Sequence, residues 1–348
     1  MTLLGPNRTF LSRHTMIHIS LLAYPDCAAS GIFGTIDAFL MANNWHRILN
    51  QHTDLPDRLF EWDILTIDGR PIQGDGQVTI VPHRSIEEVK TTDLIFIPGF
   101  IPPFRFLGSV PSKLTDWLSC HHESNAIICS TCTGTFLLAE AGLLDTQTVT
   151  TNPLFARYFK KLYPSIKLED DQILTEDDGI ICSGATTSFL DLCLYLIEKF
   201  GYEELAAVCT KALLKEPRVS QTPYSIFNYH RDHLDDTVKE AQYYLEKNFS
   251  RPIPVEDLAV RFGISPRHFV RRFKTATGDS PLQYLQRIRI ETAKQKLEKT
   301  RQPITEITRH IGYEDPNSFR KLFKKNTGLS PREYRNRFSR DLRPIPIS

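Results

Sequence analysis

Two stretches near the C-terminus repeat each other at an offset of about fifty residues, and this repeat constrains the fold more than any other feature. They span residues 265–284 and 315–334. In each, Ser-Pro or Asp-Pro precedes two Phe residues four apart, and Thr-Gly, Ser-Pro and Tyr follow. Each copy predicts a capped helix start, a buried aromatic stripe and a Gly stop. A shorter helix ending at Gly263 or Gly312 precedes each copy, so we expect two helix-turn-helix units.

Charge is divided unevenly along the 348 residues, although the formal net charge is only +1. Residues 237–343 hold 24 Lys and Arg against 12 Asp and Glu, and the remainder holds 18 against 29. A basic block joined to an acidic block indicates nucleic-acid binding by one part of the chain. A helical bundle with a basic surface is the alternative. Because repeat, caps and charge agree, double-stranded DNA is the expected partner.

Residues 237–340 resemble the AraC/XylS-type DNA-binding domain, above all in the segment ITRHIGYEDPNSFRKLFKKNTGLSP at residues 307–331. The resemblance implies two recognition helices in successive major-groove segments, about 34 Å apart. It implies base contacts by one set of side chains, with Arg reading guanine and Asn reading adenine. That set is Arg267, Val270, Arg271, Asn317, Ser318 and Lys321. A second set would contact phosphates or support the first. It comprises Arg272, Lys274, Lys324 and Lys325.

Residues 16–205 alternate apolar runs with helix-like segments. The runs are fully apolar rather than alternating, which suits buried parallel strands. They cover residues 17–24, 62–67, 94–98, 126–130 and 180–183, with shorter candidates at 78–81 and 149–151. Helices are expected at 32–43, 112–120, 133–141, 155–163 and 187–200. This alternation predicts an α/β domain, flavodoxin-like, with a parallel sheet flanked by helices, ahead of an all-α C-terminal domain.

The remaining segments complete the expected organisation. Residues 1–15 read as a loose leader without a signal peptide, and 341–348 as a tail. Residues 206–236 read as a connector, although 204–214 is a further helix candidate. The chain has no apolar run near eighteen residues, and its seven cysteines are odd in number. We therefore expect no membrane span, free thiols and a cytoplasmic location.

Residues 126–141, AIICSTCTGTFLLAEA, predict a strand, a tight turn at Cys132 and a helix. Such an elbow presents its central side chain at the carboxyl edge of a sheet, beside helix N–H groups, which favours a reactive thiol. A small buried Cys is the alternative. Cys129 and Cys132 also form a C-x-x-C pair, yet Cys129 falls in the expected strand. No second Cys/His pair stands at ligand spacing, so no metal and no cofactor are expected.

The elbow and the segments 93–99, 148–154 and 179–190 resemble the ThiJ/PfpI branch of the class I glutamine amidotransferase-like superfamily. This domain followed by an AraC-type domain resembles the GlxA-type transcriptional regulators. Four positions depart from the enzymatic pattern that the resemblance implies. Thr133 and Asn152 replace histidines, Gly31 stands where some members carry Glu, and Phe100 replaces a Gly. A thiol hydrolase needs a base beside its nucleophile, and His83, His121 and His122 are left as unplaced candidates.

These features predict a sequence-specific transcription regulator that is not an enzyme. Its α/β domain is expected to sense a small-molecule effector or to form a homodimer. The expected ligand site comprises Cys132, Thr133, Asn152 and Gly99, with Cys132 a vestigial nucleophile. The alternative is an active thiol amidase or deglycase-like domain fused to a DNA-binding domain.

Overall fold

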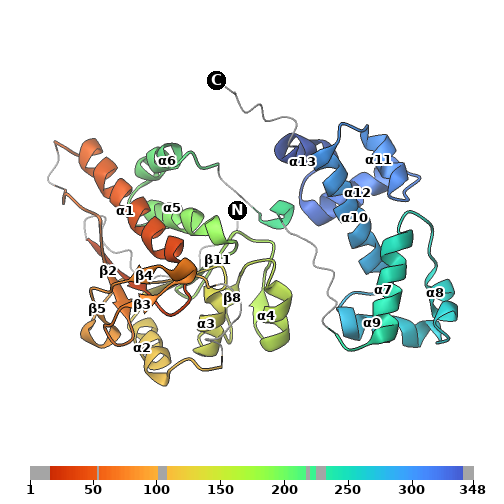
Figure 1. The fold of residues 1–348 in the computed structure, drawn as a ribbon. Coiled ribbons are helices and arrows are strands. Elements are labelled where there is room, and N and C mark those ends of the chain that lie inside the picture. The colour runs from red at the N-terminus through yellow and green to blue at the C-terminus, as the bar shows by residue number, and fades with distance from the viewer. Residues whose placement is uncertain (1–15, 53–54, 101–107, 217–219, 225–232, 340–348) are drawn as a thin grey trace. The chain divides into compact units, whose positions relative to one another are not determined.

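The structure is a computed structural model that describes residues 16–52, 55–100, 108–216, 220–224 and 233–339 (Figure 1). The chain divides into two compact units, residues 1–221 and 222–348. This division falls inside the segment that the sequence marks as a connector. Among the described residues, no helix is long and apolar enough to cross a membrane.

Unit 1 is built on a seven-stranded sheet. Its strands, in order across the sheet, are β10 (Leu174–Asp177), β11 (Ile180–Ser183), β7 (Ile127–Thr131), β6 (Leu94–Ile97), β1 (Ile17–Leu22), β2 (Phe60–Thr66) and β5 (Arg84–Ser85). Every neighbouring pair is parallel except β10 and β11. The predicted α/β domain is confirmed, with one correction: its edge strand β10 is antiparallel.

The antiparallel edge follows from a two-residue turn. Asp178 and Gly179 join β10 to β11, and both have positive φ, 45° and 78°. Asp-Gly is a favoured sequence for a type I′ hairpin turn, which requires positive φ at both positions. Two short pairs lie outside the main sheet. They are β3 (Ile72–Gln73) with β4 (Thr79–Ile80), and β8 (Thr148–Val149) with β9 (Lys167–Leu168).

Helices cover both faces of the sheet (Figure 1). Figure 1 shows α1 (Ala29–Leu49), α5 (Phe189–Phe200) and α6 (Glu203–Ala212) on one side, and α2 (Ser112–Glu123) and α3 (Gly134–Glu140) on the other. Helix α4 (Ala156–Leu162) follows β8. Short 3₁₀ helices are η1 (Asp75–Gln77), η2 (Ile86–Glu88), η3 (Thr186–Ser188) and η4 (Thr222–Tyr224). The strand candidates and helix candidates of the sequence are thus present, with α1 longer than expected at both ends.

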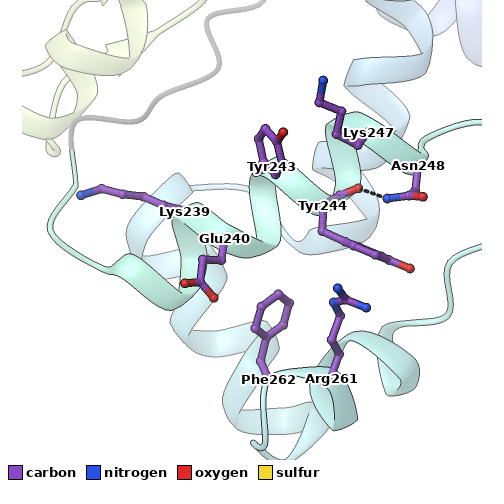
Figure 2. A pocket seen from close by; sticks show the side chains of 8 residues that line it. All are labelled: Lys239, Glu240, Tyr243, Tyr244, Lys247, Asn248, Arg261 and Phe262. Atoms are coloured by element: carbon purple, nitrogen blue, oxygen red, sulfur yellow. Dashed lines mark hydrogen bonds between the residues drawn. The ribbon is translucent and has the colours of Figure 1, made fainter.

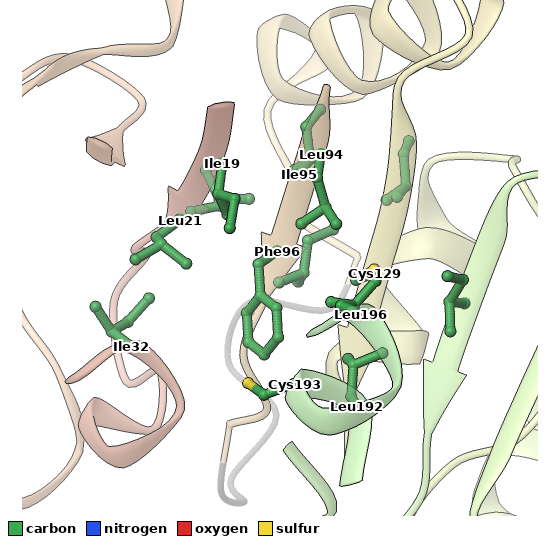
Figure 3. Packing of buried hydrophobic residues seen from close by; sticks show 14 of the residues in the cluster. Ile19, Leu21, Ile32, Leu94, Ile95, Phe96, Cys129, Leu192, Cys193 and Leu196 are labelled. Atoms are coloured by element: carbon green, nitrogen blue, oxygen red, sulfur yellow. The ribbon is translucent and has the colours of Figure 1, made fainter. Parts of the chain in front are cut away.

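The core of unit 1 includes residues of the sheet and of helices α1 to α6, and Figure 3 shows the part between the sheet and α5 and α1. Figure 3 shows strand residues such as Leu94 and Phe96 facing Leu192 and Leu196 of α5. Helix α6 adds Leu205 and Cys209 to the same core. The folded unit therefore continues past residue 205, where the connector was expected to begin, because the apolar face of α6 is buried.

Unit 2 is all helical in its described residues. Its helices are α7 (Asp236–Asn248), α8 (Val255–Arg261), α9 (Pro266–Thr277), α10 (Pro281–Lys299), α11 (Ile304–His310), α12 (Pro316–Thr327) and α13 (Pro331–Phe338). They enclose two separate apolar clusters. Helix α10 takes part in both, with Tyr284, Leu285 and Ile288 in the first and Ile290, Ala293 and Leu297 in the second.

The two repeats fold alike in detail. In the first, Phe269, Phe273 and Tyr284 pack in series, with ring centroids 5.8 and 5.4 Å apart. The matching rings, Phe319, Phe323 and Tyr334, lie 5.5 and 5.4 Å apart. The two Tyr hydroxyls donate to equivalent carboxylates, each at 2.8 Å, namely Glu246 and Glu298. The repeat in the sequence is thus a repeat in packing.

Each second helix begins and ends as the sequence predicts. Ser265 accepts a hydrogen bond from the His268 N–H, and α9 ends at Gly278, which has φ 77°. Asp315 likewise caps α12, which ends at Gly328 with φ 72°. Left-handed φ at these ends suits Gly, which has no Cβ to clash. The caps fix both helices in length and register.

Candidate nucleic-acid interface and the Cys132 site

Helices α9 and α12 turn a buried aromatic side to their own units and a polar side outward. Phe269, Phe273, Phe319 and Phe323 have no exposed surface. Eight of the ten side chains expected at DNA are exposed. They are Arg267, Arg271, Lys274, Asn317, Ser318, Lys321, Lys324 and Lys325. Apart from Ser318, whose hydroxyl is described below, these side chains can donate to phosphate or to base edges. Neither α9 nor α12 contains an acidic residue.

Ser318 is exposed but its hydroxyl is already in use. Its Oγ donates to Oδ2 of Asp315 at 2.7 Å, and its backbone N–H donates to the same oxygen at 2.9 Å. These hydrogen bonds, with one from the Asn317 N–H and the nearby charge of Lys321, hold the pKa of Asp315 below its usual value. Ser318 therefore supports the Asp315 cap of α12, and a base contact by its hydroxyl would compete with this hydrogen bond.

Arg272, expected to contact phosphate or to support the base-reading residues, pairs with a carboxylate of its own unit. Its side chain is 35% exposed, and its Nε and Nη2 donate to Oδ2 and Oδ1 of Asp235 at 2.5 and 2.9 Å. Hydrogen bonds from Arg272 lower the pKa of Asp235, and the pair raises that of Arg272. An arginine expected at phosphate is thus engaged by a carboxylate of its own unit. Val270, the other exception, is half-buried.

A basic, aromatic hollow lies between α7 and α8 (Figure 2). Its volume is about 650 Å³. Three rings line it, Tyr243, Tyr244 and Phe262, together with the cations Lys239, Lys247 and Arg261. Arg261 lies over the ring of Tyr244 with 4.3 Å to the centroid, and Lys247 lies 5.5 Å from that of Tyr243. Sequence reasoning missed this hollow, because its residues come from two helices that no motif connects.

At the carboxyl edge of the sheet, Cys132 forms the predicted elbow between β7 and α3. It has φ 56°, a strained value for a residue with a side chain, and its N–H donates to the Ser183 carbonyl at 2.8 Å. Gly99, which follows β6, lies so close that a Cβ there would stand 2.7 Å from Cys132 Cβ. Close approach of two strand ends therefore requires Gly at position 99.

The expected ligand residues do meet around this thiol. Asn152 Nδ2 donates to Cys132 Sγ at 3.2 Å, and Thr186 Oγ1 lies 3.7 Å from Sγ. Thr133 is hydrogen-bonded to the backbone of Phe100. All four expected residues are buried, so a ligand reaching Sγ must move the side chains that surround it. Sequence reasoning missed Thr186, although it follows β11, whose carboxyl end adjoins that of β7.

The candidate bases lie apart from this thiol. His83 stands beside Asp63, with 3.3 Å between Nδ1 and Oδ1, and His121 packs edge-on against Trp117. His122 Nε2 donates to the Asp178 carbonyl at 2.9 Å. The position expected for a helix Glu is closed, since a Cβ on Gly31 would lie 2.8 Å from Pro98 Cβ.

The remaining cysteines do not form a redox pair with Cys132. All seven lie in the described part of the chain, and every one is a free thiol there. Cys129 is fully buried in β7, and burial raises the pKa of its thiol well above the usual value. A thiol so placed is a poor nucleophile.

Comparison with known proteins gives the same two parts. Residues 258–337 match a helix-turn-helix domain model, and residues 55–199 match the DJ-1/PfpI family. The chain is 24% identical to the HTH-type transcriptional regulator CdhR of Pseudomonas aeruginosa over 323 residues, 90% of each chain. It is also 24% identical to the regulator GbdR of the same species over 281 residues, 80% of this chain and 75% of that one.

A solved structure supports the fold of unit 1. The putative transcriptional regulator protein from Vibrio parahaemolyticus aligns with a TM-score of 0.50 and 21% identity, over 57% of this chain and all of that one. Fold and site together define a DJ-1/PfpI α/β domain joined to tandem helix-turn-helix units. The chain is a transcriptional regulator with an AraC-type helix-turn-helix C-terminal domain and an N-terminal DJ-1/PfpI domain, and it is similar to CdhR and GbdR.

Proposed function

We propose that this regulator reads specific DNA with α9 and α12, and that its α/β unit responds to a small molecule or pairs with a second copy. The cationic outer faces of the two matching helices carry the DNA-binding part of the proposal. Arg267 and Arg271 on α9, and Asn317 and Lys321 on α12, are the exposed side chains suited to base edges.

Two substitutions separate base reading from phosphate binding. Arg271→Ala should cost about 1–3 kcal/mol on a site selected from random DNA and relax preference at one base pair. Lys324→Ala should weaken selected and random DNA alike and reduce the salt slope by about 1. Equal losses on both DNAs for Arg271→Ala would remove this residue from the base-reading set.

Sensing is supported by the way unit 1 ends. Its last residue, Gln221, is 1% exposed, and its Nε2 donates to Thr151 O, Thr150 Oγ1 and Asp170 O at 3.1, 3.2 and 3.0 Å. Thr151 Oγ1 in turn donates to the Cys132 carbonyl at 2.7 Å. A Cβ at Gly184 would stand 1.9 Å from Gln221 Oε1, so Gln221 fits only beside a glycine. A chain of hydrogen bonds thus connects the Cys132 elbow to the last residue of unit 1.

These hydrogen bonds allow a test of the sensing role. A panel of metabolites is screened by thermal shift, and each hit is added to the protein on its selected DNA. We expect a hit to change DNA affinity in the wild type, because a ligand that favours one state shifts the population. Gln221→Ala should still bind the hit but transmit less of the change, whereas the exposed Gln73→Ala should behave as wild type. Hits that leave DNA affinity unchanged in the wild type would exclude sensing.

Catalysis by Cys132 is the rival function, favoured by the strained elbow alone. The thiol receives a hydrogen bond from an amide, and an amide is not a general base. We therefore propose that the elbow no longer turns over substrate. Amide or glycated substrates consumed by the wild type, and not by Cys132→Ala, would favour the enzyme.

Pairing with a second copy is supported by an exposed apolar stripe on α1. Phe33, Leu40 and Ile48 are 41%, 48% and 52% exposed and lie at helical spacing on one face. Leu40→Glu should shift a dimer to monomer in sedimentation velocity, with Leu214→Glu, on a 93% exposed residue, as the control. The cytoplasmic location stays a prediction.

A further inference from the structure

The segment that leads into α7 lies beside the first recognition helix. Asp235 is the last residue before α7, and its Oδ1 accepts from the Val238 N–H at 3.0 Å, which caps that helix. The same carboxylate binds Arg272 of α9 through two hydrogen bonds. One side chain therefore both starts the first helix of the unit and holds a cation on the helix that reads DNA.

The hydrogen bonds made by Arg272 occupy one of the two edges through which a guanidinium can bind phosphate. Guanidinium groups bind carboxylates and phosphates alike through two parallel N–H donors. Here Nε and Nη2 are both directed at Asp235. The pair is electrically neutral, so while it is closed Arg272 adds no net attraction for DNA and displaces no counterion.

The second repeat shows that a helix-turn-helix unit folds without this pair. Fifty residues further on, the position of Arg272 is taken by Leu322. Helix α12 nevertheless has the same N-terminal Pro, the same C-terminal Gly and the same packed rings as α9. The Asp235–Arg272 pair is thus a feature of the first helix-turn-helix unit alone, where residue 235 caps α7.

A second contact fixes the arriving segment at this place. His233 Nε2 lies 2.9 Å from Gln242 Oε1, and the fully buried Gln242 donates to the Tyr284 hydroxyl at 3.1 Å. The Asp235 N–H also donates to His233 Nδ1 at 3.2 Å. Residues 233–235 are therefore held against α7, whose Gln242 is bound in turn to Tyr284 of α10, and the Asp235 carboxylate stays beside Arg272.

We propose that Asp235 sets DNA affinity by withholding Arg272 from the phosphate backbone, and that Arg272 becomes a DNA contact when the carboxylate is removed. This inference rests on the proposed DNA-binding function. It assigns Asp235 as a positioning residue, because it would act on DNA only through Arg272. It also makes the end of the connector a point from which affinity can be adjusted.

Asp235→Asn tests the proposal, because Asn also caps helices and the substitution removes the charge that holds Arg272. Binding to a selected site is measured across salt concentrations. We expect the variant to bind roughly tenfold more tightly, as for one added charge-assisted contact, and to have a salt slope steeper by about 0.9. Asp235→Ser, which caps as well, should behave in the same way.

Two comparisons make the result specific. Asp236→Asn removes a neighbouring charge that pairs with Lys239, and it should change affinity much less. Arg272→Ala combined with Asp235→Asn should abolish the gain. An unchanged or weaker affinity in Asp235→Asn, or an equal gain in Asp236→Asn, would overturn the proposal. A wild-type protein that selects no DNA would overturn the DNA-binding function itself, and the inference with it.

Discussion

The repeated Tyr residues of unit 2 form a matched pair that differs in one hydrogen bond. Tyr334 donates to Glu298, and Tyr284 donates to Glu246 but also accepts from the buried Gln242. Each carboxylate is half-buried, so water replaces much of what a Phe substitution removes. We expect Tyr334→Phe to lower the free energy of unfolding by about 1 kcal/mol. Tyr284→Phe should cost about 2 kcal/mol, because a fully buried amide also loses an acceptor.

The composition of the chain supplies the assay. All three tryptophans, Trp45, Trp62 and Trp117, belong to unit 1. Tryptophan fluorescence thus reports unfolding of unit 1 alone, whereas the far-ultraviolet helix signal reports both units, so the part of the helical transition that fluorescence does not follow belongs to unit 2. The extra 1 kcal/mol should lower the midpoint of the helical transition in Tyr284→Phe by about 4 °C relative to Tyr334→Phe. Equal midpoints would refute the role given to Gln242, and a shifted fluorescence transition would show that the damage is not local to unit 2.

Two further predictions concern thiols and pH. Burial raises the pKa of the Cys27, Cys182 and Cys209 thiols to about 11, and that of the Cys193 thiol to about 12. Iodoacetamide at pH 8 should therefore label the exposed Cys120 long before these four cysteines, as measured by peptide mass spectrometry. Labelling of Cys182 as fast as Cys120 would contradict this order. Hydrogen bonds from Ser318 and the Asn317 N–H depress the pKa of Asp315, so its stabilisation is present above the unfolded pKa, about 4, and is lost as pH falls further. The melting temperature of Asp315→Asn should therefore lie furthest below wild type near pH 7 and approach it toward pH 3, and a constant gap would exclude this linkage.

Much of the architecture follows from local sequence signals. Strands such as β6, LIFI, are fully buried between two helical layers, so they appear in the sequence as unbroken apolar runs. Helices α9 and α12 are bounded by cap and stop residues that depend on nothing distant. Strand β10, LTED, could not be predicted from its own residues, because it forms a strand only by pairing with β11. Its Asp-Gly turn was the available signal.

The sites, too, include residues that local sequence predicts and residues whose partners are distant in the sequence. Gly99, Thr133 and Asn152 come together at Cys132 because all follow strands or turns at one sheet edge, which sequence order and fold class predict. The charge of Arg272 is equally visible in the sequence, but its partner is 37 residues away in a segment with no period. Whether a cation faces DNA or a carboxylate of its own chain depends on tertiary structure alone.

Helix α10 spans both clusters of unit 2 without a break, and Ile288 and Ile290 anchor it to different ones. Inserting a single residue between them would rotate one helix-turn-helix unit about 100° around the axis of α10 and move it about 1.5 Å along that axis. The insertion would break the contacts that Arg289 makes with the Phe249 carbonyl and the Tyr313 ring, and it would change the orientation of α9 relative to α12. If α9 and α12 read DNA as proposed, the length of α10 sets the spacing between the two half-sites, and this spacing can change only if α10 changes.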